Sequence, residues 1–366
     1  MRALTVEPGR AGSARLDERD EPVAGPGEAV VEALLVGVCG TDREIMSGSY
    51  GAAPPGADRL VIGHEAVGRV VSSPTEVDLA VSQLVVPMVR RPDPVPCPSC
   101  AVGEWDMCQN GRYTEHGITG LDGFAAERFT VHADHVVAVP ADLGDLAVLV
   151  EPASIVAKAW EQVTRIGSRA SWQPQTVLIV GAGPVGLLAA LLARQRGFTT
   201  HVVDIVDTGP KPGLVADLGA EYHTGKLSDA CPSPDVIVEC TGVGSVVLDA
   251  IIHNGPTGIV CLAGISSGAR AIELDTASLN RRMVLENDVV FGTVNANARH
   301  YRAAVDALAA ADPDWLHRLI TRRVPLTDWA QALTPRHDDI KVTIDLSTDT
   351  SSGHLGTTDR AGRPPS

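Results

Sequence analysis

"TVLIVGAGPVGLLAALLARQRG", residues 176–197, joins two apolar runs through three closely spaced glycines. The run before the glycines is typical of a buried strand, and the leucine- and alanine-rich run after them is typical of a helix. Glycines at this spacing allow a tight turn and bring free helix N-terminal amides close to a phosphate. The stretch therefore predicts a dinucleotide-binding turn. The residues predicted to contact the cofactor are Gly181, Gly183, Pro184, Val185 and Gly186.

Asp204 follows the next apolar run, eighteen residues after Gly186. A carboxylate at this place can bind both hydroxyls of an adenosine ribose and repels a 2′-phosphate. The two residues after it supply no guanidinium, and Lys211 lies further on, past two turn-forming residues. The pattern favours NAD over NADP. The alternatives are a turn that serves packing alone and an ordinary solvated carboxylate at Asp204.

The composition indicates an ordinary globular protein. The 366 residues suggest two domains, and a hydrophobic content of 44% with a mean hydropathy of +0.08 is ordinary for a folded chain. Forty-five acidic against thirty basic residues give a net charge of −15, which repels phosphate backbones and anionic lipid surfaces. Nucleic acid is therefore not an expected partner.

The N-terminal stretch "MRALTVEPGR" lacks the continuous apolar run of a signal peptide, and the longest apolar stretch is interrupted by glycine and proline. We therefore expect neither export nor membrane insertion. The seven cysteines of such a chain indicate metal ligation or free thiols rather than disulfides. A cytoplasmic location is the resulting expectation.

Two kinds of pattern divide the chain. Residues 1 to about 150 show short β-rich runs separated by glycine and proline, which predict a small barrel or sandwich. The pattern then alternates between helix and buried strand, as in an α/β unit with a parallel sheet. The closing run "IKVTIDL" is expected to return as a strand to the first domain. The polar, Ser-, Thr- and Gly-rich residues 347–366 predict a flexible tail.

A second motif combines potential metal ligands. Cys39 ends an apolar run, His64 and Glu65 follow twenty-five residues later in "GHEAVG", and Glu151 stands in "LVEPAS". A thiolate, an imidazole and a carboxylate form a zinc set that leaves one position open for substrate. Taken singly, Cys39 is more typical of a buried small side chain and His64 of a packed core histidine.

With "CGTD", "GHE" and "GAGPVG" in this order and spacing, the chain resembles the zinc-dependent medium-chain dehydrogenase/reductase family over residues 1 to about 346. Within it, "HGITGLDGF", "LVEPASIVAKAWE" and "TVNANARHY" resemble the glucose 1-dehydrogenases of archaea and bacteria. The resemblance implies an α/β protein with a GroES-like β-barrel catalytic domain (residues 1–155 and 296–346). It also implies a Rossmann domain with a doubly wound parallel sheet (residues 156–295).

The resemblance implies a catalytic zinc held by Cys39, His64 and Glu151. Glu65 would stand beside the ion, able to enter or leave its shell. Thr41 would be the hydroxyl that relays the substrate proton. Glu44 stands where many alcohol dehydrogenases of the family carry a histidine, so it either passes the proton onward or binds a sugar hydroxyl.

The resemblance further implies contacts with substrate and nicotinamide. Asn295 would lie near the nicotinamide. The bland alternatives are a solvated loop charge for Glu115, a surface residue for His300 and a turn former for Asn295. The residues implied to bind substrate are Thr41, Glu115, Glu151 and His300.

"DPVPCPSCAVGEWDMC" resembles the family's structural zinc lobe, which normally carries four cysteines. Here Cys97, Cys100 and Cys108 are present, and the expected first ligand falls on Pro94, which cannot bind a metal. The neighbouring Asp93 is the candidate fourth ligand. The alternative is three reduced thiols packed in a loop.

The sequence thus predicts a zinc-dependent enzyme that oxidises a sugar hydroxyl, at C1 of glucose or a related aldose, by hydride transfer to NAD(P). The alternatives are another zinc-dependent polyol, aminocyclitol or amino-alcohol dehydrogenase, a zinc-free quinone or enoyl reductase, and a cofactor-binding protein without turnover. The resemblance also implies a homo-oligomer, either a dimer or a tetramer.

Overall fold

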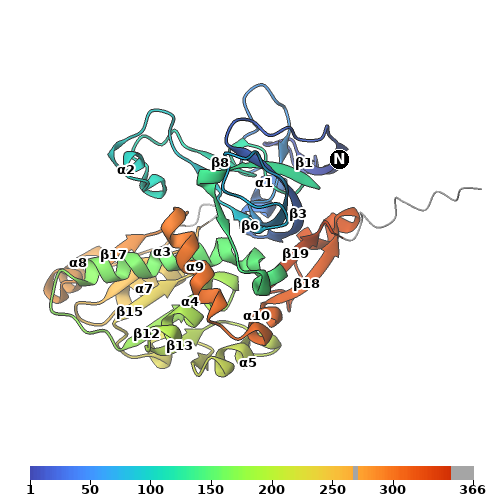
Figure 1. Cartoon of the computed structure of the whole chain (residues 1–366). Coiled ribbons are helices and arrows are strands. Elements are labelled where there is room, and N and C mark those ends of the chain that lie inside the picture. The colour runs from blue at the N-terminus through green and yellow to red at the C-terminus, as the bar shows by residue number, and fades with distance from the viewer. Residues whose placement is uncertain (267–270, 348–366) are drawn as a thin grey trace, which may run out of the picture.

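The computed structural model of the chain describes residues 1–266 and 271–347. Figure 1 shows two halves, a β-rich half at the top and an α/β half below it. The sheets are of the kinds that the sequence predicts, so the fold class is confirmed. Apart from Ser347, the predicted flexible tail lies outside the described residues.

The β-rich half is built around one mixed sheet in the order β11-β6-β5-β3-β19-β18, with β10 paired to β3. Two three-stranded sheets, β2-β1-β4 and β7-β8-β9, complete it. β3 is the central strand, and its last four residues are all buried because neighbouring elements cover both faces. The strands are β1 (Arg2–Val6), β2 (Arg15–Glu18), β3 (Glu28–Val38), β4 (Leu60–Val61), β5 (Glu65–Ser72), β6 (Leu84–Pro87), β7 (Arg90–Arg91), β8 (Thr114–His116), β9 (Gly120–Leu121), β10 (Arg128–His132) and β11 (Val136–Ala138).

Short helices connect these strands. They are α1 (Gly40–Met46), α2 (Pro98–Ala101) and the 3-10 helices η1 (Trp105–Met107), η2 (Ala133–His135) and η3 (Ala141–Leu149). The long helix α3 (Val150–Gly167) then leads into the α/β half (Figure 1).

The α/β half contains a parallel sheet in the order β14-β13-β12-β15-β16-β17. The chain starts in the middle and winds outward in both directions, which is the doubly wound arrangement. Its strands are β12 (Thr176–Val180), β13 (Thr199–Val203), β14 (Glu221–His223), β15 (Val236–Glu239), β16 (Ile259–Leu262) and β17 (Val289–Gly292). Its helices are α4 (Pro184–Gln195), α5 (Pro210–Asp217), α6 (Leu227–Ala230), α7 (Gly244–His253) and α8 (Thr276–Glu286).

The last part of the described chain returns to the β-rich half. Helix α9 (Ala298–Ala309) packs on α3, and β19 (Lys341–Asp345) pairs antiparallel with β3. The predicted return of "IKVTIDL" is confirmed by this pairing, whereas the residue limits of the two domains stay a prediction. The remaining elements are α10 (Pro313–Leu319), β18 (Ile320–Pro325), η4 (Leu326–Asp328) and α11 (Trp329–Leu333).

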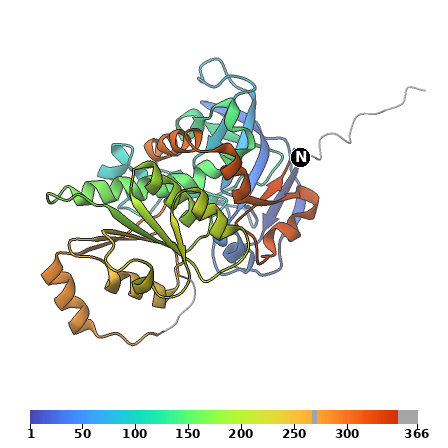
Figure 2. The same ribbon diagram turned by 90° about the horizontal axis from the view of Figure 1, so that it is seen from below.

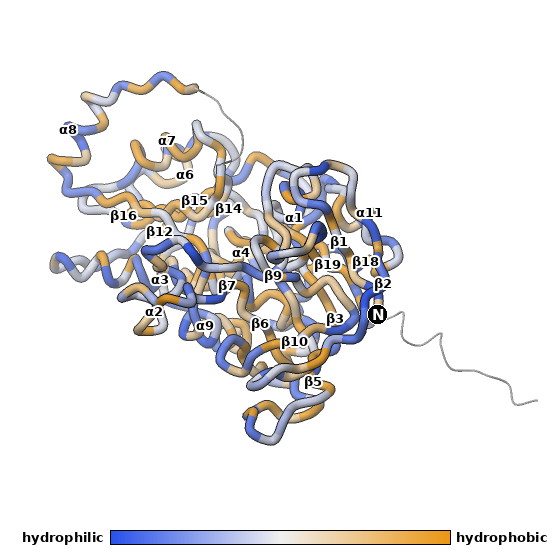
Figure 3. The backbone as a smooth tube through the Cα atoms, turned by 90° about the horizontal axis from the view of Figure 1, so that it is seen from above, coloured by the Kyte–Doolittle hydropathy of each residue, from blue (hydrophilic) through white to orange (hydrophobic). Residues whose placement is uncertain are grey.

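Apolar segments fill the interior of both halves, and polar residues follow the surface loops (Figure 3). One buried cluster runs from Val67 of β5 through Trp160 of α3 to Ile179 of β12, so α3 shares a core with both sheets. Helix α8 has no buried residue and extends away from the sheet (Figure 2). Within residues 1–266 and 271–347, no helix has the length and apolar character needed to cross a bilayer.

The segment after Asp204 differs from the sequence prediction. The sequence analysis treats Gly209 and Pro210 as turn-forming residues that separate Lys211 from Asp204. Instead Pro210 begins α5. Proline fits the first turn of a helix because the backbone N–H that it lacks has no hydrogen-bond partner within the helix there. This correction changes the position of Lys211, which is described below.

Gly186 tests the packing of the nucleotide-binding turn. A Cβ at Gly186 would overlap the carbonyl oxygen of Gly181, whereas a Cβ at Gly183 would meet nothing within 4 Å. We therefore expect Gly186→Ala to lower the free energy of unfolding by about 1–3 kcal/mol. Gly183→Ala, the matched control, should change it by less than about 0.5 kcal/mol. Urea denaturation measures both, and equal midpoints for the two variants would contradict the packing argument.

Candidate active site

The two halves meet at a cavity of about 550 Å³. Residues of the predicted metal site and Val185 of the predicted nucleotide turn line the same space. The lining residues are Cys39, Thr41, Glu44, Ser49, Tyr50, His64, Glu65, Val89, Glu115, Ile118, Glu151, Pro152, Ile155, Val185, Ala263, Ile265, Ser266, Thr293, Val294 and Asn295.

Strand pairing brings three of the predicted metal residues together. The antiparallel register of β3 and β5 sets Gly37 opposite Glu65, so Cys39 just after β3 lies beside His64 just before β5. The Cys39 Sγ and His64 Nε2 atoms are 3.1 Å apart, and a carboxylate oxygen of Glu65 joins them within 4.8 Å. A side chain at Gly37 would collide with the Glu65 carboxylate, so glycine is required there.

Asp42 lies behind His64 and orients it. Its Oδ1 is 3.5 Å from His64 Nδ1, and its Oδ2 accepts a hydrogen bond from the backbone N–H of Cys39 at 2.9 Å. Burial alone would lower the pKa of His64, but the negative charges of Cys39 and Asp42 raise that pKa well above 6.5. A carboxylate behind an imidazole fixes the ring so that Nε2 faces the metal position. The sequence analysis missed Asp42, although its place three residues after Cys39 is a helix-capping signal.

Lys341 of β19 pairs with Glu65. Its Nζ donates to Glu65 Oε2 at 2.5 Å, and its side chain is 1% exposed. Burial would lower the pKa of Lys341, but Glu65 and Cys39 raise it, so the ammonium stays charged. The sequence analysis missed this residue. Its signal was a lysine at the start of the strand "IKVTIDL", whose other members are mostly apolar.

Glu151 stands in the first turn of α3 and faces the cavity. Burial, followed by the negative charge of Glu65, raises the pKa of its carboxyl to about 8. Within the described part of the chain, Glu151 is not among the residues whose donor atoms lie within 4.8 Å of Cys39 and His64. Its role as a zinc ligand therefore stays a prediction.

The residues present fit a divalent ion such as zinc. Thiolate sulfur, imidazole nitrogen and carboxylate oxygen are the donors that zinc takes in proteins. Asp42, Glu65 and Glu151 are buried acids around this site, and the Lys341 ammonium contacts Glu65. The raised pKa values of His64 and Glu151 show that the metal-free site meets its remaining negative charge by holding protons, and a bound cation would take the place of those protons.

Of the predicted substrate residues, Thr41, Glu115 and Glu151 line the cavity, and so do Glu44 and Asn295, the latter predicted near the nicotinamide. Glu115 is buried, and its Oε1 accepts bonds from Arg90 Nε at 3.1 Å, from Arg90 Nη2 at 3.0 Å and from Asn295 Nδ2 at 2.9 Å. The alternative of a solvated loop charge for Glu115 is therefore wrong. The Arg90 side chain holds this carboxylate in a fixed position.

The structure does not bring His300 into the cavity lining. His300 is 1% exposed, its Nδ1 accepts from the backbone N–H of Asn297 at 3.2 Å, and its Nε2 lies 3.1 Å from Glu161 Oε2. Asp106 and Lys158, which form a buried ion pair at 2.9 Å, lie in the same network. His300 thus joins α9 to α3, and its predicted contact with substrate is not carried into the proposed function.

The nucleotide-binding turn has the geometry that its glycines predict. Gly181 has a φ of +97°, a conformation that L-residues rarely adopt, and Gly183 caps α4 with Pro184 in its first turn. Asp204 Oδ2 accepts the backbone N–H of Ala182 at 2.6 Å, which fixes the carboxylate beside the turn.

Lys211 donates from Nζ to Asp204 Oδ2 at 3.0 Å. The sequence argument that placed this lysine too far away was wrong, because the first turn of α5 brings it back. Burial would raise the pKa of Asp204, but the Ala182 N–H and the Lys211 ammonium lower it. A positive charge at this place can pair with a 2′-phosphate, so the local chemistry suits NADP as well as NAD.

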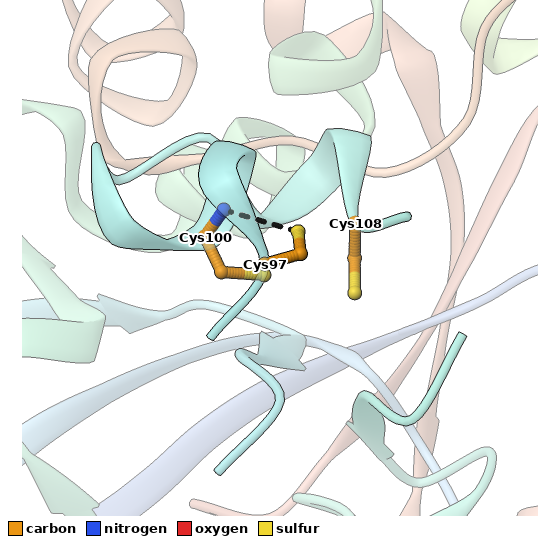
Figure 4. A group of neighbouring side chains, drawn as sticks. All are labelled: Cys97, Cys100 and Cys108. Carbon is orange, nitrogen blue, oxygen red and sulfur yellow. Dashed lines mark hydrogen bonds between the residues drawn. The ribbon is translucent and has the colours of Figure 1, made fainter. Parts of the chain in front are cut away.

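Three cysteines gather in the lobe around α2, with side chains close to one another (Figure 4). The sulfurs of Cys97, Cys100 and Cys108 lie within 4.8 Å of one another. Backbone N–H groups, first that of Gln109 and then that of Cys100, lower the pKa of Cys97 to about 6. Burial raises the pKa of Cys100 to about 11. The group can hold a zinc ion, which would draw all three thiols into the thiolate form.

Both oxygens of the Asp93 carboxylate already have hydrogen-bond partners. Its Oδ1 accepts from the Val95 N–H at 2.8 Å, and its Oδ2 accepts from Asn110 at 2.9 Å and from Arg112 at 3.2 Å. In the described chain, Asp93 is not part of the group of donor atoms that contains the three cysteines. A fourth ligand from this carboxylate stays a prediction.

Two family models together cover most of the chain. Residues 25–141 match the alcohol dehydrogenase GroES-like domain, and residues 144–346 match the glucose dehydrogenase C-terminus. The chain belongs to the medium-chain dehydrogenase family. This dehydrogenase is an oxidoreductase similar to glucose 1-dehydrogenases.

Relatives match this dehydrogenase over nearly its whole length. The glucose 1-dehydrogenase of Thermoproteus tenax is 40% identical over 354 residues, which cover 95% of this chain and 100% of the relative. Glucose 1-dehydrogenase 1 of Caldivirga maquilingensis is 39% identical over 353 residues, which cover 95% of this chain and 99% of the relative. The solved glucose dehydrogenase of Haloferax mediterranei, in complex with NADP, Zn and gluconolactone, has a TM-score of 0.88 at 32% identity. That match covers 95% of this chain and 100% of that one.

We expect Glu151 to make the metal-free protein less stable as pH rises. Its folded pKa of about 8 exceeds the ordinary 4.5, so in this window the folded state retains a proton that the unfolded state has lost. The free energy of unfolding then falls with increasing pH, by at most about 1.4 kcal/mol per pH unit. Glu151→Gln should remove this slope. Urea denaturation of chelator-treated protein between about pH 5 and about pH 8 measures it, and equal slopes for wild type and variant would contradict the expectation.

Zinc content tests the cysteine lobe. We expect Cys108→Ser to lower the zinc content by about one ion per chain, because two thiolates hold the ion far more weakly than three. Cys261→Ser, a buried thiol of β16 outside the group, is the matched control and should keep the wild-type content. Elemental analysis after dialysis measures both, and an unchanged content in Cys108→Ser would show that the lobe holds no zinc.

Proposed function

We propose that this dehydrogenase oxidises the C1 hydroxyl of glucose, or of a closely related aldose, to the lactone by hydride transfer to NAD(P)⁺. The observation that carries the proposal is one cavity in which the Cys39, His64 and Glu65 donor group and Val185 of the nucleotide-binding helix share the same space. The C1–H bond and the hydroxyl O–H bond break, and the products are the lactone, NAD(P)H and one proton.

The metal residues have distinct parts in this proposal. Cys39 and His64 hold the ion together with Glu151 or Glu65, and Asp42 keeps the His64 ring in its ligating orientation. When bound, zinc supplies a Lewis acid that lowers the pKa of a hydroxyl, and the nicotinamide supplies the hydride acceptor.

Thr41 is the proposed first acceptor of the substrate proton. It stands two residues after Cys39 in the first turn of α1 and lines the cavity, which supports this role. Glu44, one turn further along α1, also lines the cavity and either passes the proton onward or binds a sugar hydroxyl.

A polyhydroxylated substrate needs several fixed polar partners for one orientation. Glu115 is such a partner, because Arg90 and Asn295 hold its Oε1 in place at the cavity wall. Asn295 has a φ of +60°. In the proposal, its side chain lies between the Glu115 carboxylate and the side of the cavity that holds the nicotinamide.

The choice between NAD and NADP depends on Asp204 and Lys211. The Asp204 carboxylate supports the preference for NAD that the sequence favours, because it can bind both ribose hydroxyls. The Lys211 ammonium, 3.0 Å from that carboxylate, and the NADP bound in the Haloferax mediterranei enzyme support use of NADP. We propose that the chain uses both cofactors, with NAD preferred, and that Lys211→Ala strengthens this preference.

Assembly as a dimer or tetramer and a location in the cytoplasm belong to the same proposal. The resemblance to the family supports both. Light scattering coupled to gel filtration measures the assembly state.

The central test is a spectrophotometric substrate panel with NAD and NADP in parallel, combined with zinc analysis. We expect glucose or a related aldose to be oxidised faster than polyols, aminocyclitols and amino alcohols. Chelation should abolish turnover, and added zinc should restore it. Preference for a polyol would move the proposal to another substrate class, and turnover that resists chelation would favour a zinc-free reductase. Tight NAD binding without its reduction on any substrate would favour a protein without turnover.

Thr41 has a matched pair of variants. We expect Thr41→Val to lower kcat by about 10²- to 10⁴-fold, because the proton acceptor is lost while the side-chain volume is kept. Thr41→Ser retains the hydroxyl and should retain most of the activity. Zinc content is measured for both, so that a lost metal is not mistaken for a lost relay. A Thr41→Val enzyme with the wild-type kcat would contradict the role of Thr41.

A further inference from the structure

A second group of potential metal ligands lies on the nucleotide-binding half, outside the active-site cavity. It consists of His201 on β13 with Glu221 and His223 on β14, and we call it the edge cluster because β14 is an edge strand of the parallel sheet. The parallel register sets His201 opposite Glu221, and His223 follows Glu221 by two residues. Alternate residues of a strand share a face, so all three side chains point to the same side of the sheet.

The distances within the edge cluster match those of a zinc-type site. His201 Nδ1 lies 3.0 Å from His223 Nε2, and Glu221 Oε2 lies 3.5 Å from the former and 3.8 Å from the latter. Ligands about 2.0–2.1 Å from a tetrahedral ion are separated from one another by about 3.3–3.4 Å. The three observed separations bracket this value, so one ion can reach all three atoms after small side-chain shifts.

Burial gives the two imidazoles a fixed position and the ion an open side. The His201 and His223 side chains are 14% and 24% exposed, whereas Glu221 is 69% exposed. Neutral imidazole nitrogen is the form that binds metals, and the exposed carboxylate leaves room for water in the remaining position.

We propose that the edge cluster binds one divalent first-row transition metal ion through His201, Glu221 and His223. Two imidazoles and one carboxylate suit Zn²⁺, Ni²⁺ and Cu²⁺, whereas hard ions such as Mg²⁺ and Ca²⁺ prefer all-oxygen sites. This site is separate from the catalytic residues and from the cysteine lobe, and it does not depend on the proposed function.

The ion has a structural consequence in this place. β14 has three residues and is held on one side by β13. The backbone N–H of Asp204 donates to the carbonyl of His223 at 3.1 Å, and the Tyr222 hydroxyl bonds to the carbonyl of Val206. An ion that links His201 to His223 therefore ties β14 to β13 and fixes the strand that supports the ribose-binding loop.

The test uses the full chain without a histidine tag, loaded with zinc and dialysed, and titrated with Ni²⁺ by isothermal calorimetry. We expect the wild type to hold one divalent ion per chain more than the two histidine variants described next, counted as zinc and Ni²⁺ together, because zinc that stays in the edge cluster after loading occupies the same site. Mutation of a residue that only supports a metal ligand lowers metal affinity by about 10- to 100-fold. Loss of a ligand itself should lower it at least as much, so we expect His201→Ala and His223→Ala each to weaken Ni²⁺ binding by at least that factor. His337→Ala, an exposed histidine paired with Asp338, is the matched control and should bind Ni²⁺ as the wild type does.

Two further measurements keep the proposal falsifiable if a histidine variant fails to fold. Glu221→Gln changes an exposed side chain and should weaken Ni²⁺ binding while leaving the fold intact. Pulsed electron paramagnetic resonance of Cu²⁺ bound to the zinc-loaded wild type should detect two imidazole nitrogens. No additional ion in the wild type, equal Ni²⁺ affinity in the wild type and both histidine variants, or a Cu²⁺ spectrum with fewer than two imidazoles would overturn the proposal. Any of these outcomes would leave the edge cluster as a group of hydrogen-bonded polar side chains alone.

Discussion

The pairing of β3 with β5 on one side and with β19 on the other is the constraint on which the active site depends. It sets Gly37 opposite Glu65 and Val38 opposite Val342, so that Glu65 and Lys341 meet although 276 residues separate them. A slip of one residue in either pairing would turn these side chains to the opposite face of the sheet. Strand β19, the last strand of the described chain, is therefore part of the site.

The charge of this buried region explains why Lys341 is needed. Asp42, Glu65 and Glu151 are each less than a tenth exposed, and a buried carboxylate without a partner is unfavourable by several kcal/mol. Lys341 neutralises Glu65 directly, and Asp42 faces the His64 ring. Among the described residues, no ion pair to Glu151 is found, and its raised pKa reflects this imbalance. A bound cation would lower the pKa of Glu151 again. A cation and a proton on Glu151 therefore compete to compensate the same excess of negative charge.

How far the sequence could predict the structure depends on the range of the interaction. The glycine turn is local, since Gly181 and Gly186 lie five residues apart, and its strand, turn and helix were predicted correctly. The fold class and the approach of Cys39 to His64 followed from motifs that the family resemblance connects. Lys341 could not be predicted as a partner of Glu65, because only the β3–β19 register brings them together. Lys211 was misplaced because Pro210 was taken to form a turn, although proline also begins helices.

His300 shows a different limit. The resemblance implies a contact between His300 and substrate, but a position near the start of α9 does not say which neighbour the side chain faces. The capping arrangement with Asn297 turns the ring toward Glu161 of α3, where it joins two helices. A polar residue that is close in sequence to cavity-lining residues can thus stabilise the cavity wall without lining the cavity itself.

The catalytic group and the edge cluster contain similar donors in opposite surroundings, and this difference separates their roles. Cys39, His64 and Glu65 lie at the cavity between the two halves, with Lys341 buried against Glu65, so an ion bound there would be shielded from bulk water and would face the cavity. The edge cluster has a largely exposed carboxylate and does not line that cavity. Shielding strengthens the electrostatic action of an ion on a reacting hydroxyl, whereas exposure weakens it. The first group therefore suits chemistry, and the second suits the stabilisation of an edge strand.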